Sequence, residues 1–214
     1  PVSYNFGNCS SEKLPMICKK FGKKGLLIIP KNISLIEKRI RRILDKSNVN
    51  IDIFYLEEGE PTTTFIDTSA KKMEKHHFDF IIGLGGGSAL DFAKTISLKF
   101  TNNDPIWEYA NLSYRKPKKI KNKSIPVIAI PTTAGTGSEF TPYAVLDNNE
   151  INQKGTIQDK ILFPKEAIID PSLMLTMPKE LTISTGLDAF SHALESYINK
   201  SKVSPLSEYF AIKS

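Results

Sequence analysis

The residues that point most directly to chemistry form a glycine-rich turn at residues 83–88. Four of the first five are glycines, and Ser88 follows them. Glycines let a backbone approach a ligand closely and adopt positive φ, and free N–H groups at a helix start attract anions. A diphosphate is the natural ligand of such a turn. The alternative is a tight turn without a ligand, which is less favoured because glycine lowers stability wherever it is not needed.

A second polar cluster lies at residues 130–139, after the fourth predicted strand. It carries four hydroxyl side chains and two glycines. Open α/β sheets bind ligands in crevices outside the carboxyl ends of their strands. The alternative is a hydrogen-bonded surface loop, but two such clusters at successive strand ends support each other. The glycine turn is not the usual dinucleotide fingerprint, because that motif follows the first strand and this one follows the third.

Asp188 and His192 are the candidate metal ligands. They are four residues apart in a predicted helix, so they share one face. A carboxylate and an imidazole one turn apart can bind one divalent ion, although an exposed Asp–His pair or a helix cap has the same spacing. The chain has three histidines. We expect the other two, His76 and His77, on the surface of the first domain.

Alternating strands and helices must position these clusters. Strands are predicted at residues 25–29, 49–55, 78–83 and 126–130, and helices at residues 33–44, 65–75 and 89–99. This rhythm predicts an α/β fold whose N-terminal domain is a Rossmann-like parallel sheet with helices on both faces. Only helices are predicted afterwards, at residues 182–197 and 204–213. We therefore divide the chain into a dinucleotide-binding domain at residues 1–178 and the truncated start of an all-α domain at residues 179–214.

Composition excludes several other classes of protein. No run of eighteen apolar residues occurs, so we expect no membrane span. The net charge is +6 and the pI about 9.2. The main basic run, residues 115–123, has no interleaved aromatic residues and contains a proline, so we expect a solvated loop and no nucleic acid partner. Two cysteines, Cys9 and Cys18, make no disulfide framework, which predicts a cytoplasmic protein.

Five segments together resemble the iron-containing (group III) alcohol dehydrogenase family, which belongs to the dehydroquinate synthase-like superfamily. They are residues 60–63, 85–94, 131–139, 167–171 and 185–197. The resemblance runs in order over nearly the whole chain. It implies a metal-dependent enzyme that transfers a hydride between NAD or NADP and a small alcohol, aldehyde or ketone. We further expect a homo-oligomer.

The resemblance also assigns cofactor contacts. Gly86, Gly87 and Ser88 are expected to hold the pyrophosphate, with Asp91 near the nicotinamide end.

Five further residues are expected along the dinucleotide. Thr132, Thr133 and Thr136 would line it, Leu175 would border the adenosine, and Lys154 would reach a ribose.

The family binds Fe²⁺, or sometimes Zn²⁺, through one aspartate and three histidines. Asp188 and His192 match two of these ligands, and we expect the other two beyond Ser214, so the chain is interpreted as a fragment. The metal would polarise the alcohol or carbonyl oxygen. No residue is assigned as a general base.

One position departs from the family pattern. NAD-preferring members carry an acid just after the first predicted strand, where this chain has Pro30 and Lys31. Lys31 favours a 2′-phosphate, so we expect NADP to be tolerated or preferred.

Two alternatives stay open: a polyol dehydrogenase or dehydroquinate synthase-like relative, and a nucleotide-binding module without catalysis. Residues 132–139 favour the alcohol dehydrogenase.

Overall fold

The computed structural model describes residues 2–57, 59, 61–199 and 203–214. Its main element is a six-stranded sheet in which every neighbouring pair is parallel. The strands, in their order across the sheet, are β1 (Ser3–Phe6), β9 (Glu166–Ile169), β6 (Val127–Pro131), β4 (Phe80–Gly85), β2 (Lys24–Pro30) and β3 (Asn50–Leu56). The glycine turn and the second polar cluster follow β4 and β6, which are neighbours.

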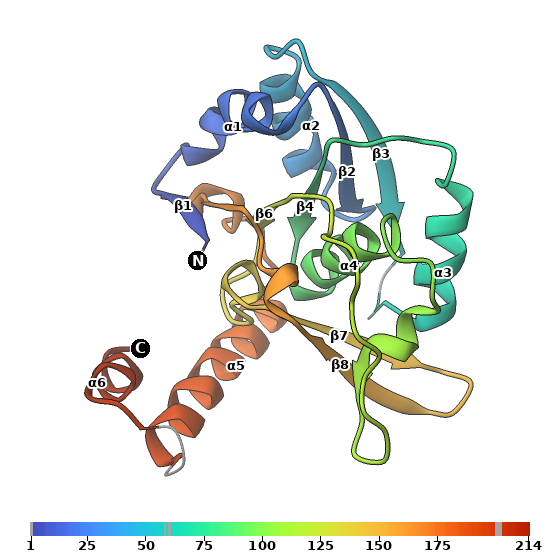
Figure 1. Cartoon of the computed structure of the whole chain (residues 1–214). Helices are drawn as coiled ribbons and strands as arrows, with labels where there is room; N and C mark the ends of the chain where they lie inside the picture. Colours follow the sequence, from blue (N-terminus) through green and yellow to red (C-terminus); the bar gives the residue numbers. More distant parts are fainter. Residues whose placement is uncertain (1, 58, 60, 200–202) are drawn as a thin grey trace.

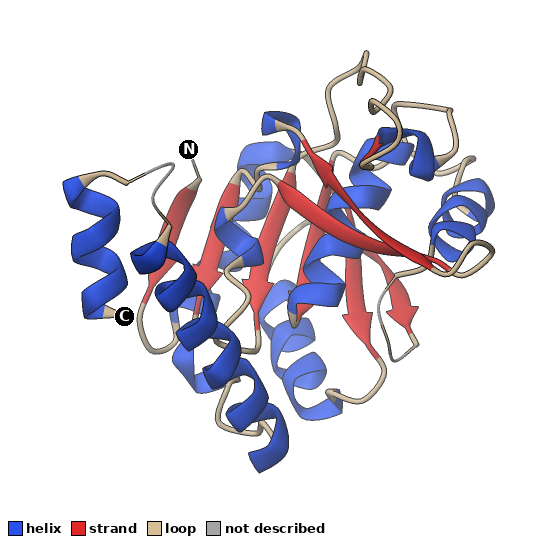
Figure 2. Cartoon of the chain, turned by 90° about the horizontal axis from the view of Figure 1, so that it is seen from below, coloured by secondary structure: helices blue, strands red, loops and turns tan. Residues whose placement is uncertain are grey.

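Helices cover both faces of this sheet, as the sequence predicts (Figures 1 and 2). Alternate side chains of β2 explain the arrangement. Leu26 and Ile28 belong to one apolar core, and Leu27 and Ile29 belong to the other. The helices α3 (Thr63–Lys72) and α4 (Gly87–Lys99) contribute to the first core, and α1 (Leu14–Phe21) and α2 (Ser34–Leu44) contribute to the second.

A second, antiparallel sheet was not expected from the sequence. It consists of β5 (Ala110–Asn111), β8 (Gln153–Gln158) and β7 (Tyr143–Asn148). Its buried face packs against the core beside α4 through Ala144, Leu146 and Ile157. The strand β8 is mostly polar, so its sequence carries no apolar run that would indicate a strand.

Other differences are local. The strand β1 and the helix α1 were not predicted. The helix α3 is two residues longer at its start than expected, because Thr62 accepts a hydrogen bond from the Phe65 N–H at 3.2 Å and caps it. It ends at Lys72, three residues before the predicted end.

The chain ends in two helices, α5 (Lys179–Ile198) and α6 (Pro205–Lys213). Figure 1 shows α5 extending away from the sheet. Among its described residues only Thr185 is buried. The position of the domain boundary at residue 178 stays a prediction. No described helix combines the length and apolarity that crossing a membrane requires.

The basic run lies in a loop, as the sequence predicts. Residues 116–123 form no helix or strand, and their lysines are exposed. Cys9 and Cys18 are both free thiols. Burial raises the pKa of Cys18 to about 12, which makes that thiol unreactive.

Candidate functional site

The glycine turn aims the start of α4 outward from the end of β4. Gly85 adopts φ 148°, and a Cβ there would lie 2.7 Å from the Cβ of Ala89, so only glycine fits. Gly86 is the N-cap of α4, and its carbonyl accepts from the Ala89 N–H at 3.0 Å. The N–H groups of Gly87 and Ser88 belong to the first helical turn, where amides have no acceptor within the helix. The turn therefore presents N–H donors and the positive end of the helix dipole.

The second polar cluster touches this turn directly. Gly85 and Pro131 are partners in the register of β4 and β6. The Thr132 N–H donates to the Gly85 carbonyl at 2.9 Å. A Cβ at Gly87 would lie 2.8 Å from Cγ2 of Thr136. The two clusters thus form one continuous surface at the carboxyl edge of the sheet.

Two adjoining hollows lie over this surface. The first, a cleft of about 720 Å³, is lined by Gly86, Gly87, Ser88, Thr132, Thr133 and Thr136, among others. The second, of about 610 Å³, shares Gly87, Ser88 and Thr136 with the cleft. It also reaches Asp91, Asp188 and His192. The structure therefore brings together all but two of the site residues that the sequence predicts.

The two exceptions are Lys154 and Leu175. The Lys154 Nζ lies 3.9 Å from Asp147 Oδ1 on β7, while Thr156, two residues further along β8, lines the second hollow. Leu175 is 83% exposed, and its neighbour Thr176 lines the cleft. The cofactor contacts assigned to both residues stay predictions.

Asp91 is held by a buried network. Its Oδ1 accepts from Ser138 Oγ at 2.6 Å and lies 3.4 Å from Lys94 Nζ, and its Oδ2 accepts from the Val145 N–H at 2.9 Å. Lys94 is completely buried and also donates to the Tyr143 carbonyl at 2.7 Å. Burial raises the pKa of Asp91 and lowers the pKa of Lys94 from their ordinary values. The pair joins α4 to β7 and to the second polar cluster, and so holds the wall of the second hollow.

Asp188 and His192 are neighbours on α5, as their spacing predicts. The His192 Nε2 lies 3.6 Å from the Asp188 Oδ1, and both side chains are about half exposed toward the second hollow. Their oxygen and nitrogen donors suit Fe²⁺ or Zn²⁺. The described residues contain no group of three or more metal-binding side chains. His76 and His77 are exposed, and His76 Nδ1 lies 3.4 Å from Asp52 Oδ2, so neither is near this pair.

The residues that line the cleft but were missed from the sequence include Glu57, Leu181 and Thr185. Glu57 follows β3, the strand beside β2, and forms an ion pair with Lys31. Its place after a parallel strand could have indicated a site residue. Leu181 and Thr185 come from the first part of α5, and no local pattern indicates that this part of the helix lines the cleft.

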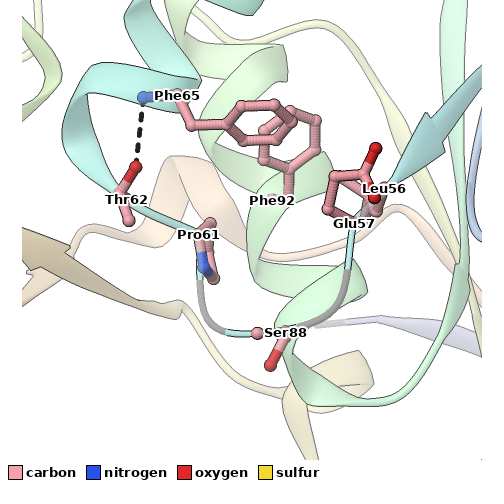
Figure 3. A pocket seen from close by; sticks show the side chains of 8 residues that line it. Leu56, Glu57, Pro61, Thr62, Phe65, Ser88 and Phe92 are labelled. Atoms are coloured by element: carbon pink, nitrogen blue, oxygen red, sulfur yellow. Dashed lines mark hydrogen bonds between the residues drawn. The ribbon is translucent and has the colours of Figure 1, made fainter.

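An apolar pocket of about 220 Å³ adjoins Ser88 (Figure 3). Its wall includes the rings of Phe65 and Phe92, whose centroids are 5.3 Å apart. Thr62, which caps α3, also lines it. Glu60, the first residue of the 60–63 segment, lies outside the described residues. The start of α3 and the residue that follows the glycines thus line the same pocket.

Comparison with known proteins identifies relatives of the whole chain. The family model described as iron-containing alcohol dehydrogenase matches residues 1–171. Alcohol dehydrogenase 4 of Saccharomyces cerevisiae is 31% identical, over 100% of this chain and 55% of its own length.

Solved structures agree with this match. An iron-containing alcohol dehydrogenase from Thermotoga maritima is 34% identical with a TM-score of 0.87, and the match covers 100% of this chain and 58% of that one. A sulfoacetaldehyde reductase from Bifidobacterium kashiwanohense, crystallised with NAD⁺, is 31% identical with a TM-score of 0.85, over 95% of this chain and 54% of that one. The chain thus spans about half the length of these relatives.

Proposed function

Because this chain belongs to the iron-containing alcohol dehydrogenase family, we propose that it carries the cofactor site of an NAD(P)-dependent oxidoreductase that interconverts small alcohols with aldehydes or ketones. One observation carries the proposal. The cleft over the glycine turn shares Gly87, Ser88 and Thr136 with the adjoining hollow, which Asp188 and His192 line. A dinucleotide in the cleft would therefore bring its reactive end toward the metal-binding pair.

The proposed cofactor contacts follow from the geometry of the two turns. The N–H groups of Gly87 and Ser88 would bind the pyrophosphate, with Gly86 allowing close approach. The threonines at positions 132, 133 and 136 would line the dinucleotide. Asp91 would lie beside the nicotinamide end, held there by Ser138. Lys154 and Leu175 are proposed to approach the ribose and the adenosine.

Asp188 and His192 are proposed as two ligands of Fe²⁺ or Zn²⁺. Any further ligands would come from outside the described residues. When bound, the metal supplies Lewis acidity toward the alcohol or carbonyl oxygen. The residues of this chain would orient the nicotinamide toward that oxygen and hold the walls of both hollows, and the bound cofactor would supply the hydride chemistry.

Titration of the 214-residue chain with NADH and with NADPH tests the cofactor site. We expect saturable binding that quenches protein fluorescence or enhances the fluorescence of the reduced nicotinamide. Turnover is tested on the longest reading frame that contains this chain, with short aldehydes, in the presence and absence of Fe²⁺ or Zn²⁺. A correctly folded protein without affinity for either cofactor would contradict the proposal.

A second candidate function is a nucleotide-binding module without catalysis. One observation favours it: the described residues contain no group of three or more side chains that could bind a metal ion. Cofactor binding by the 214-residue chain without turnover, in an assay where the longest reading frame is active, would support this function for the chain alone.

The choice between NAD and NADP depends on Lys31. Its side chain is 59% exposed and is paired with Glu57, and Glu57 and both chain neighbours of Lys31 line the cleft, so we propose that Lys31 can approach a 2′-phosphate. We expect Lys31→Ala to weaken NADPH binding by about tenfold, the loss of roughly one charge-assisted hydrogen bond, and to leave NADH binding nearly unchanged. Isothermal titration measures both. Lys38→Ala, an exposed lysine on α2, is the matched control. A clear NADH preference in the unaltered chain would refute the expectation.

A further inference from the structure

Gly135 lies where the second polar cluster meets α5. A Cβ at this position would lie 3.0 Å from the carbonyl carbon and from the Cβ of Thr185, and closer still to the Thr185 carbonyl oxygen. The backbone of Gly135 is outside the left-handed region, so alanine could adopt its conformation. The approach of α5, and not the shape of the turn, therefore requires glycine here.

The contact is with the helix itself. Two of the three nearest atoms are backbone atoms of Thr185, so rotation of a side chain cannot relieve the clash. The Thr185 Oγ1 is bonded back to the Leu181 carbonyl at 2.9 Å, and Thr185 is the buried residue among the described part of α5. A side chain at residue 135 would push α5 away from the sheet.

The same face of α5 carries the proposed metal ligands. Asp188 and His192 lie three and seven residues after Thr185, and residues at these spacings share one helix face. Thr185 lines the cofactor cleft, and Asp188 and His192 line the adjoining hollow. The contact at Gly135 is thus made next to the face of α5 that carries both proposed ligands.

We propose that Gly135 is a positioning residue that sets the distance between the bound dinucleotide and the metal-ligand pair of α5; this inference rests on the proposed function. Hydride transfer needs reacting atoms in close and fixed alignment, and a displacement on the order of 1 Å can slow such a step about 100-fold. Gly135 does not line the cleft. Its replacement should therefore change the distance between the dinucleotide turn and the metal-ligand pair more than it changes the affinity for the cofactor.

The test compares Gly135→Ala with Gly186→Ala. Gly186 adjoins Thr185 on α5, an added Cβ there would meet no atom outside the adjoining turns of its own helix within 4 Å, and it has no positive φ. Nitroxide labels are attached at the exposed thiol of Cys9 and at Glu195→Cys on α5, while Cys18 is buried and stays unlabelled. Pulsed EPR then measures the distance between the labels, and fluorescence titration measures the dissociation constant for NADH.

We expect Gly135→Ala to shift or broaden the distance distribution and to leave NADH affinity within about threefold, and we expect Gly186→Ala to change neither. In the longest reading frame, Gly135→Ala should lower kcat about 100-fold and increase the isotope effect with deuterated NADH. An unchanged distance distribution, or a loss of NADH affinity without a shift of α5, would overturn the inference. If neither the unaltered chain nor the two variants bind NADH or NADPH, the proposed function fails. The position of α5 is measured by pulsed EPR without cofactor, so its outcome does not depend on that result.

Discussion

Replacing Gly87 with valine should lower the affinity for NADH by about 100-fold or more. The new Cβ would lie 2.8 Å from Cγ2 of Thr136, and the γ-methyl groups would occupy the cleft over the first turn of α4. Charge-assisted hydrogen bonds are each worth about 1.5–3 kcal/mol, and a tenfold change in affinity corresponds to about 1.4 kcal/mol. Loss of two such bonds to a diphosphate therefore accounts for the effect. Fluorescence titration with NADH measures it.

Gly186→Ala serves as the control, since an added methyl group there meets no atom outside the adjoining turns of its own helix within 4 Å. It should bind NADH like the unaltered chain. Thermal unfolding shows whether the Gly87→Val protein is folded. A folded Gly87→Val protein with unchanged affinity would mean that the pyrophosphate does not bind at this helix start.

Replacing Asp170 with alanine should lower the free energy of unfolding by about 3–5 kcal/mol. The side chain is completely buried after β9. It accepts hydrogen bonds from Ser11 Oγ at 2.6 Å and from the Cys9 N–H at 3.1 Å, and it forms an ion pair with Arg39 at 3.1 Å. It also accepts from the Ser172 N–H at 3.1 Å. Removing the carboxylate leaves the Arg39 guanidinium and several donors without their partner. Urea denaturation followed by circular dichroism measures the loss.

The same carboxylate predicts a pH dependence. Burial alone would raise the pKa of Asp170, but hydrogen bonds from Ser11, Ser172 and the Cys9 N–H outweigh it and hold the pKa below its ordinary value. A carboxyl group whose pKa is lowered by folding stabilises the folded state above its unfolded pKa of about 3.9, and this contribution is lost as the pH falls through the folded pKa. Stability should therefore decline below about pH 4, and less steeply in Asp170→Ala.

Asp45→Ala is the matched control, because Asp45 is exposed at the end of α2. Its effect should stay within about 0.5 kcal/mol. If Asp170→Ala does not fold, Ser11→Ala removes a single hydrogen bond to the carboxylate and should still cost about 1.5–3 kcal/mol. A change below about 1 kcal/mol in both variants would show that the network does not stabilise the fold.

Local patterns were sufficient for the parts of the site that lie at strand ends. Residues 78–83 and 126–130 are apolar runs, so both were predicted as strands, and their carboxyl ends had to meet if the strands were neighbours. The structure makes them neighbours, with Thr132 bonded to Gly85.

Contacts between distant segments were not predictable in this way. The carboxylate of Asp91 is bonded to Ser138 and to the Val145 N–H, which are 47 and 54 residues away in the chain. The strand that holds Val145 alternates buried and exposed residues over a short stretch and was not recognised from sequence. Periodicity reports which face of an element is buried, but not which other element covers it.

The sequence by itself determined the parallel α/β fold, the glycine-rich helix start and the spacing of Asp188 and His192, because each depends on backbone preferences and on side chains a few residues apart. Only the tertiary structure decided that Glu57 and Thr185 line the cleft, that Lys94 is buried beside Asp91, and that α5 rests on Gly135. These arrangements depend on how closely separate elements pack, and close packing is a property of the assembled core and not of any one segment.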